Sequence, residues 1–177
     1  MLVATAILST RLVGQAVSLG FAATAGSGWQ IEGIEVAYLR SLHVGPLRSV
    51  MLGGRGGSFI DEGAIVGGSR GVIGAAMLGL RTGLARLADV GNETNPAPLG
   101  ADLSIEVSGY VGSNSPLPQG SPWAAVSLLP GLRFGSGEGV RYSFVVGPTV
   151  FFGPVTTVHT FLGLRFELPL AHHSAHP

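Results

Sequence analysis

The sequence contains no cysteine and no lysine, and only 11% of its 177 residues are charged. Without cysteine there is no disulfide framework and no thiolate metal site. Ten arginines balance ten acidic residues, so the formal net charge is zero. A nucleic-acid-binding protein needs a basic excess to neutralise phosphates, so we expect no nucleic acid as a partner. Soluble domains carry about 25% charged residues, which makes a water-soluble globule unusual for this composition.

The chain also lacks a convincing membrane helix. The best candidate, Tyr142–Leu164, is long enough to cross a bilayer as a helix and carries no charge unless His159 is protonated. It contains Pro148 and Pro154 together with many threonines, β-branched residues and aromatic residues, which favour strands and turns. We therefore expect no membrane helix here.

The two ends of the chain differ from the part between them. Residues 1–16 combine the apolar run Leu2–Leu8 with the small-x-small sequence Gly14-Gln15-Ala16, and they are interpreted as a secretory signal peptide, possibly truncated. The alternative is an extra strand or a frayed end. Residues 17–170 form one predicted domain, and residues 171–177 form a tail containing His172, His173 and His176.

Between these ends the apolar pattern has a period of two, which is typical of strands with two different faces. Glu32 and Glu35 fall on opposite faces, which predicts a bulge or an early turn. Pro130 and Pro148 fall within predicted strands, where a bulge or a shorter strand is expected because proline cannot donate a ladder hydrogen bond. The eight predicted strands are Val17–Thr24, Trp29–Arg40, Leu47–Phe59, Gly71–Leu87, Asp102–Gly112, Trp123–Gly135, Val140–Phe152 and Val155–Leu170.

The composition of the two strand faces indicates which one points inward. One face is apolar, and the other is mostly Gly, Ser, Thr and Ala with a few arginines and acids. A water-facing surface so poor in charge would be poorly solvated, whereas small, sparsely charged residues suit a narrow interior. An apolar exterior around a polar interior is the arrangement of a transmembrane barrel, and closure removes strand edges that lipid would not tolerate. The predicted fold is an all-β, eight-stranded antiparallel up-and-down transmembrane β-barrel.

The tripeptide Gly-Leu-Arg occurs three times, ending at Arg81, Arg133 and Arg165, at equal offsets along three predicted strands. Each arginine is expected to point inward, near the end of the barrel that carries the termini. An unpaired charge in a narrow lumen is costly, so acidic partners are expected nearby. If the Gly135–Gly139 turn is symmetric, Arg133 and Arg141 face each other across it. The predicted lumen ion-pair network consists of Arg81, Asp102, Glu106, Arg133, Arg141, Arg165 and Glu167.

Outward neighbours of this network include Phe134, Tyr142 and Phe166, which are expected at one height on three adjacent strands. Aromatic residues at one height on the outer wall are typical of the girdle at a membrane interface.

With these features the chain resembles the small eight-stranded bacterial outer-membrane barrels of the OmpX and OmpA-barrel type, over about residues 17–170. The last strand also resembles the signal by which the barrel-assembly machinery recognises such proteins, with Gly163, Phe166 and Leu168 at its positions and Phe161 in place of the polar residue. The resemblance implies location in the bacterial outer membrane, contact with its lipids and recognition by that machinery, with an unidentified envelope protein as a further possible partner.

The leading functional hypothesis is a non-enzymatic barrel whose lumen is filled by side chains, with a structural, adhesive or envelope-assembly role and no cofactor. Gly67-Gly68-Ser69-Arg70-Gly71 fits the G-x-S-x-G pattern, but that elbow requires an α/β sheet. The histidine tail is not expected to form a metal site because it lacks surrounding groups to orient the ligands. Three alternatives stay open. One is a binder or conduit for small hydrophobic ligands, using small inward residues such as Gly20, Ala22 and Gly79; the second is a soluble lipocalin-like barrel; the third is a lipid-modifying outer-membrane enzyme.

Overall fold

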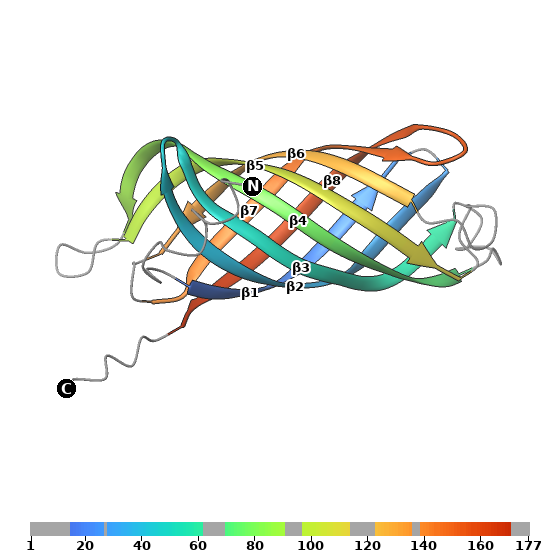
Figure 1. Ribbon diagram of the computed structural model, residues 1–177, viewed down its shortest axis with the longest axis horizontal. Helices are drawn as coiled ribbons and strands as arrows, with labels where there is room; N and C mark the ends of the chain where they lie inside the picture. The colour runs from blue at the N-terminus through green and yellow to red at the C-terminus, as the bar shows by residue number, and fades with distance from the viewer. Residues whose placement is uncertain are drawn as a thin grey trace, which may run out of the picture.

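The computed structural model describes residues 15–26, 28–61, 70–90, 97–113, 123–135 and 139–170. Each strand pairs antiparallel with the next, and β1 pairs with β8, so that the sheet closes into a barrel with strands running obliquely to its long axis (Figure 1). The predicted eight-stranded antiparallel barrel is confirmed. The strands are β1 (Gln15–Ala25), β2 (Trp29–Val44), β3 (Leu47–Asp61), β4 (Arg70–Val90), β5 (Ala97–Gly112), β6 (Trp123–Phe134), β7 (Arg141–Phe152) and β8 (Thr157–Pro169).

The first two strand residues, Gln15 and Ala16, belong to the segment predicted as a signal peptide. The rest of that segment and the histidine tail lie outside the described residues. Within the described ranges there is no helix with the length and apolar character needed to cross a bilayer.

The up-and-down order gives the barrel two different ends. One end, here called the terminal end, carries the start of β1, the end of β8 and the turn at residues 45–46. The other end, here called the distal end, carries the turn between β1 and β2 and the connection of residues 153–156 between β7 and β8. Gly28 and Gly45 occupy the turns with φ of 94° and 58°, a left-handed backbone conformation that glycine adopts without the steric cost of a side chain.

The strand register climbs steadily around the barrel. Residues paired across consecutive strands form a row that starts at Gly100 in β5 and returns to β5 at Tyr110, ten residues farther along. A stagger of this kind accompanies the strand tilt that closure requires. The row passes through Gly100, Arg133, Ser143, Arg165, Gly20, Glu35, Arg55, Ala75 and Tyr110.

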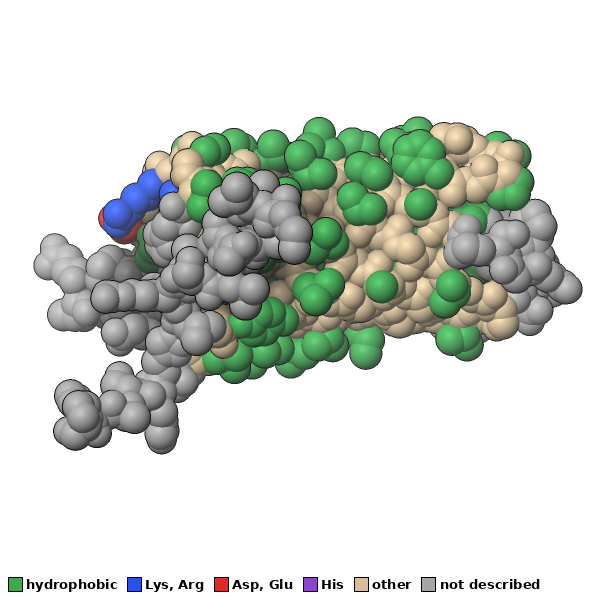
Figure 2. Space-filling view, in the orientation of Figure 1, with side chains coloured by type: hydrophobic (Ala, Val, Ile, Leu, Met, Phe, Trp, Pro, Cys, Tyr) green, Lys and Arg blue, Asp and Glu red, His purple; other side chains and the backbone are tan. Residues whose placement is uncertain are grey.

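The inside and outside faces are those that the composition predicted. Thirty large hydrophobic side chains are exposed among the described residues, with members on every strand. Figure 2 shows hydrophobic side chains spread along the barrel wall, with the charged side chains visible on this face towards one end. By contrast, Glu35, Arg81, Glu106 and Arg165 are buried within the barrel, Arg165 with no exposed surface at all. The outer wall is therefore mainly apolar, and the buried charged groups lie inside.

Two expectations about strand irregularity need correction. Pairing between β2 and β3 is regular from Trp29 to Ser41, so no bulge separates Glu32 from Glu35. Glu32 is exposed on the outer wall, where Gln30 Nε2 donates a 3.4 Å hydrogen bond to it, and Glu35 is buried in the lumen. Both faces of this strand therefore carry a carboxylate, which the alternating side-chain directions of a regular strand allow.

The two strand prolines are accommodated without a register shift. The β6–β7 pairing stops at Ser127 with Thr149 and resumes at Gly131 with Val145 in the same register. Pro130 and Pro148 lie in this gap, and each keeps a pairing partner on its other side, Leu103 and Thr160 respectively. The missing proline N–H groups thus interrupt one ladder locally while the barrel stays closed.

Register shifts are concentrated at the terminal end. They occur between Ser41 and Val44 in the β2–β3 ladder, between Leu47 and Ser49 in the β3–β4 ladder, and at two places in the β4–β5 ladder, after Gly83 and after Arg86. Residues 84–90 of β4 are exposed, and pairing continues to Val90 with Ala97, so this hairpin extends beyond the predicted strands Gly71–Leu87 and Asp102–Gly112.

Candidate functional site

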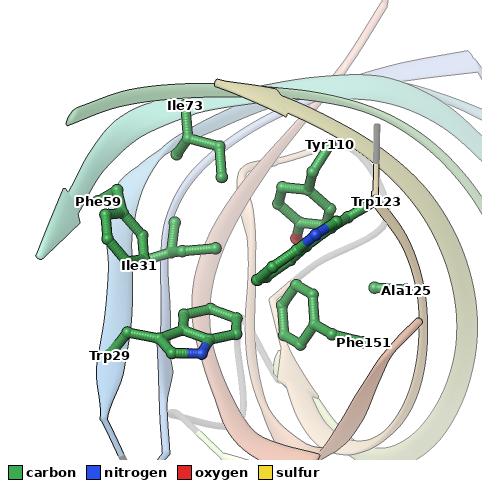
Figure 3. Packing of buried hydrophobic residues seen from close by; sticks show 8 residues of the cluster. All are labelled: Trp29, Ile31, Phe59, Ile73, Tyr110, Trp123, Ala125 and Phe151. Carbon is green, nitrogen blue, oxygen red and sulfur yellow. The ribbon is translucent and has the colours of Figure 1, made fainter. Parts of the chain in front are cut away.

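The candidate site is the lumen, whose distal end is filled by aromatic and aliphatic side chains. Trp29 is central: its ring lies 5.0 Å from Trp123, 4.9 Å from Phe151 and 3.8 Å from His159. His159 is buried in the lumen. We call this group, shown without His159 in Figure 3, the aromatic plug. It comprises Trp29, Ile31, Phe59, Ile73, Tyr110, Trp123, Ala125, Phe151 and His159.

Below the aromatic plug, four charged side chains form a closed ring of ion pairs across the lumen, here called the charged ring. It consists of Glu35, Arg55, Glu106 and Arg165, from β2, β3, β5 and β8. Each arginine contacts both carboxylates. Arg55 Nε lies 3.0 Å from Glu35 Oε2, and Arg165 Nη2 lies 2.7 Å from Glu106 Oε1; Arg55 also pairs with Glu106, and Arg165 with Glu35.

The surroundings of the charged ring support its cations. Two positive and two negative charges balance, which is the condition under which buried charges are tolerated. The Arg55 guanidinium lies 4.5 Å from the centre of the Phe161 ring, a cation–π distance, and its Nη1 donates a 3.4 Å hydrogen bond to the Tyr110 hydroxyl. The charged ring is therefore held by strands on several sides of the barrel at once.

Small lumen residues make room for these large ones. Gly20 is paired with Glu35 on one side and with Arg165 on the other, and an added Cβ would lie 3.1 Å from Glu35 Cγ and 2.6 Å from the Leu164 carbonyl oxygen. A side chain on Gly79 would meet Met51 Cε at 2.9 Å and Glu106 Cγ at 3.2 Å. Gly20 and Gly79 thus leave the space that the side chains of Glu35, Met51 and Glu106 occupy.

Towards the terminal end the lumen opens into a cavity of about 430 Å³, here called the vestibule. Two further ion-pair groups lie in its wall. Glu167 pairs with Arg81 and lies 3.6 Å from Arg141 Nε, and Asp102 Oδ2 accepts a 2.7 Å hydrogen bond from Arg133 Nε. The vestibule wall also includes Ala16, Leu39, Leu42 and Arg48.

The structure places the seven residues of the predicted network in three groups. Arg165 and Glu106 join the charged ring, Arg133 pairs with Asp102, and Glu167 pairs with Arg81 and Arg141. The Gly-Leu-Arg arginines therefore do not form one layer. Because the register climbs around the barrel, equal offsets along different strands do not correspond to equal heights. Arg133 and Arg141 are not opposite each other either, since Arg133 pairs with Ser143.

Sequence reasoning missed Glu35 and Arg55, two of the four members of the charged ring. Glu35 shares strand parity with Trp29, Ile31 and Leu39, so unbroken alternation would have placed it inside. Arg55 lies among glycines at positions 53, 54, 56 and 57, where no apolar pattern marks the faces. Its partner across the ladder, Glu35, is set by a register that the sequence does not show.

On the outer wall near the terminal end, Phe134, Tyr142 and Phe166 are paired in one row. The Phe134 and Tyr142 rings stack at 4.9 Å with an interplanar angle of 12°, and Tyr142 meets Phe166 edge-on at 5.6 Å. Leu168 is exposed on the same outer wall. Gly163 is buried on the inner face of β8, where an added Cβ would lie 2.9 Å from Phe161 Cε1 and from Val145 Cγ2.

Other candidate chemistry receives no support from the described residues. No group of three or more His, Asp or Glu side chains able to hold a metal ion occurs among them. Gly67, Gly68 and Ser69 of the G-x-S-x-G sequence lie outside them, as does the histidine tail.

Comparison with solved structures gives distant matches. No protein-family model and no curated protein matches the chain. Among solved structures, the N-terminal β-barrel domain of Pseudomonas aeruginosa OprF is 16% identical, with a TM-score of 0.49 over 88% of this chain and 99% of that one. Neisserial surface protein A (NspA) is 12% identical, with a TM-score of 0.45 over 88% of this chain and 95% of that one. The fold rests on the strand number, pairing order and closure of this chain itself, which are those of the small eight-stranded outer-membrane barrels that its sequence resembles.

Proposed function

We propose that the protein is a non-enzymatic integral barrel of the bacterial outer membrane, with a lumen filled by side chains. The observation that carries this proposal is the reversal of polarity. Large hydrophobic side chains cover the wall on all eight strands, and the buried charges lie in the lumen. The shortest strand has 11 residues, which is enough to cross the hydrocarbon core when tilted.

A soluble barrel, the second alternative, fits the outer wall poorly. Soluble monomers rarely expose contiguous apolar patches of more than a few hundred Å². Here the exposed residues include Phe21 at 63%, Leu52 at 63% and Val158 at 64%, on three different strands. In a bilayer these side chains contact hydrocarbon, so they are not exposed to water. Under this proposal the lipids of the outer membrane are the first partner of the protein.

The filling of the lumen argues against a general pore or conduit. The charged ring and the aromatic plug lie one behind the other along the axis. A void of about 20 Å³ lies beside Ala22, Ala75 and Phe161. That is little more than the room one water molecule needs. The packing of the aromatic plug and the charged ring supports a filled lumen over a binder of small hydrophobic ligands in this part of the barrel.

A filled, stable barrel suits a structural or adhesive role, or a place in an envelope assembly with a protein partner. The aromatic row of Phe134, Tyr142 and Phe166 supports a girdle at the membrane interface near the terminal end. In this proposal the terminal end faces the periplasm, and β8, with Gly163, Phe166 and Leu168, is recognised by the barrel-assembly machinery during insertion.

The first test is electrophoretic migration in detergent with and without boiling, combined with fractionation of a bacterial envelope. The expected result is a folded form that migrates differently from the boiled form and is recovered in the outer-membrane fraction. A protein that stays in the aqueous phase without detergent would overturn the proposal.

A second test addresses the conduit alternative. The folded protein is reconstituted in planar lipid bilayers, and conductance is compared for wild type and for Trp29→Ala, which opens the aromatic plug. We expect no steady conductance from the wild type. Stable wild-type channels, or release of small solutes from vesicles that contain it, would favour the conduit.

A further inference from the structure

The vestibule at the terminal end has an unusual balance of charge. Among the described residues, its wall contains four guanidinium groups, from Arg48, Arg81, Arg133 and Arg141, and two carboxylates, from Asp102 and Glu167. The wall therefore carries two more positive charges than negative ones. The charged ring deeper in the lumen is neutral by itself, so it does not compensate for this excess.

The two carboxylates do not provide hydrogen-bond partners for all of the guanidinium nitrogens in the vestibule wall. Glu167 is shared between Arg81 and Arg141, and Asp102 is taken by Arg133. Arg81 Nη2 and Arg141 Nε are buried and have no hydrogen-bond partner. A buried nitrogen donor without a partner costs free energy, and the Arg81 side chain is only 7% exposed. Within the described part of the chain, no carboxylate lies within ion-pair distance of Arg48 either.

We propose that the vestibule is a binding site for a phosphate group, held by Arg81, Arg141 and Arg48. A phosphate group carries about −1.5 to −2 charges at neutral pH, which matches the excess of two positive charges. Its oxygens accept hydrogen bonds from guanidinium groups in the fork geometry that arginine presents. Arg81 Nη2, which has no hydrogen-bond partner, is a donor that this ligand completes.

The size of the vestibule indicates that the phosphate is part of a larger molecule. Its volume of about 430 Å³ is within the range of small-molecule sites. Leu39, Leu42 and Ala16 give part of the wall an apolar surface, which suits the carbon skeleton of a phosphate ester. Free phosphate and a phosphate monoester share the group that is recognised, and the experiment separates them.

The experiment is calorimetric titration of the full chain, folded in detergent micelles, with inorganic phosphate and separately with glycerol phosphate, at ionic strength held constant with sodium chloride. We expect saturable binding with a Kd of about 1 mM or tighter. Tighter binding of glycerol phosphate than of inorganic phosphate would identify an ester as the ligand class, and equal binding would identify the free anion. Absence of saturable binding for both would overturn the proposal.

Variants locate the site. Arg141→Gln removes one donor and leaves Glu167 paired with Arg81, so the fold is retained, and phosphate binding should weaken at least tenfold, about 1.4 kcal/mol. The matched control is Arg86→Gln, which makes the same charge change at an exposed arginine paired with Asp89 outside the vestibule wall. It should bind as the wild type does. Equal weakening in both variants would mean general electrostatic attraction and would overturn the site.

Asp102→Asn provides a test in the opposite direction. The change removes a carboxylate with little change of volume, releases Arg133 and raises the positive excess of the wall by one. Phosphate should bind several-fold more tightly, and unchanged or weaker binding by the folded variant would contradict the assignment. Heat-dependent gel migration of each variant verifies folding independently of ligand, so failure of this site is distinguishable from failure of the outer-membrane proposal.

Discussion

Replacement of Arg165 by methionine is the sharpest test of the charged ring. The wild-type ring contains two guanidinium groups and two carboxylates, and Arg165 contacts both Glu35 and Glu106. In Arg165→Met, one guanidinium remains to serve two carboxylates, so one negative charge is uncompensated. All four side chains are at most 8% exposed, so water cannot replace the lost partner.

The magnitude follows from two estimates. Removing one partner of a buried ion pair costs about 3–5 kcal/mol. The variant can limit this loss by binding a proton at the excess carboxylate. Protonating a glutamate of ordinary solution pKa, about 4.3, costs about 3.7 kcal/mol at pH 7 and about 1 kcal/mol at pH 5. The free energy of unfolding should therefore fall by about 3–4 kcal/mol at pH 7, and the deficit should shrink as pH falls because the folded variant holds one more proton than the unfolded chain.

Urea-induced unfolding in lipid vesicles, followed by tryptophan fluorescence, measures this loss. Both tryptophans, Trp29 and Trp123, lie in the aromatic plug and report on the lumen. The double variant Glu35→Gln/Arg165→Met leaves one guanidinium and one carboxylate, so its loss should be smaller than the sum of the single losses by about 1–3 kcal/mol. A deficit below about 1 kcal/mol at pH 7, or additive single losses, would refute the reasoning.

Three further outcomes are expected. In the same urea assay, Gly20→Ala should lower the free energy of unfolding by about 2 kcal/mol or more, because its Cβ would lie 2.6 Å from the Leu164 carbonyl oxygen. The control Gly109→Ala should be neutral, because nothing lies within 4 Å of the added Cβ. Arg133→Leu should lower the melting temperature less than Arg165→Met does, since the Arg133 side chain is 25% exposed and water can solvate the Asp102 left behind; an unchanged melting profile would contradict a role for that pair. Leu128→Arg on the outer wall should cost about 2–4 kcal/mol in lipid vesicles, and stabilisation instead would indicate that the wall faces water.

The class of fold was predictable because strand alternation is a local property. Side chains on a strand alternate between two faces whatever its neighbours are. Leu103, Ile105 and Val107 therefore predicted the outer wall of β5, and Asp102, Ser104 and Glu106 its inner wall, before any pairing was known. The structure confirms both sets, with Glu106 fully buried and Ile105 49% exposed.

The prolines and the glycine-rich strand show where local reasoning became inaccurate. Pro130 and Pro148 predicted a bulge or shorter strands. In the structure the missing N–H groups leave one gap in the β6–β7 ladder, because β6 also pairs with β5 and β7 also pairs with β8. In β3 the glycines removed the apolar signal around Arg55, and the face of that arginine could not be assigned.

The sequence by itself determined the strand number, the closed antiparallel class and the direction in which each face points, because these depend on residue type and a period of two. Only the tertiary structure decided which charges meet. Arg165 and Glu35 are 130 residues apart in the chain, and they join because Gly20 lies between them in a register that climbs ten residues around the barrel. Closure of the sheet sets that stagger, and a strand taken alone contains no information about it.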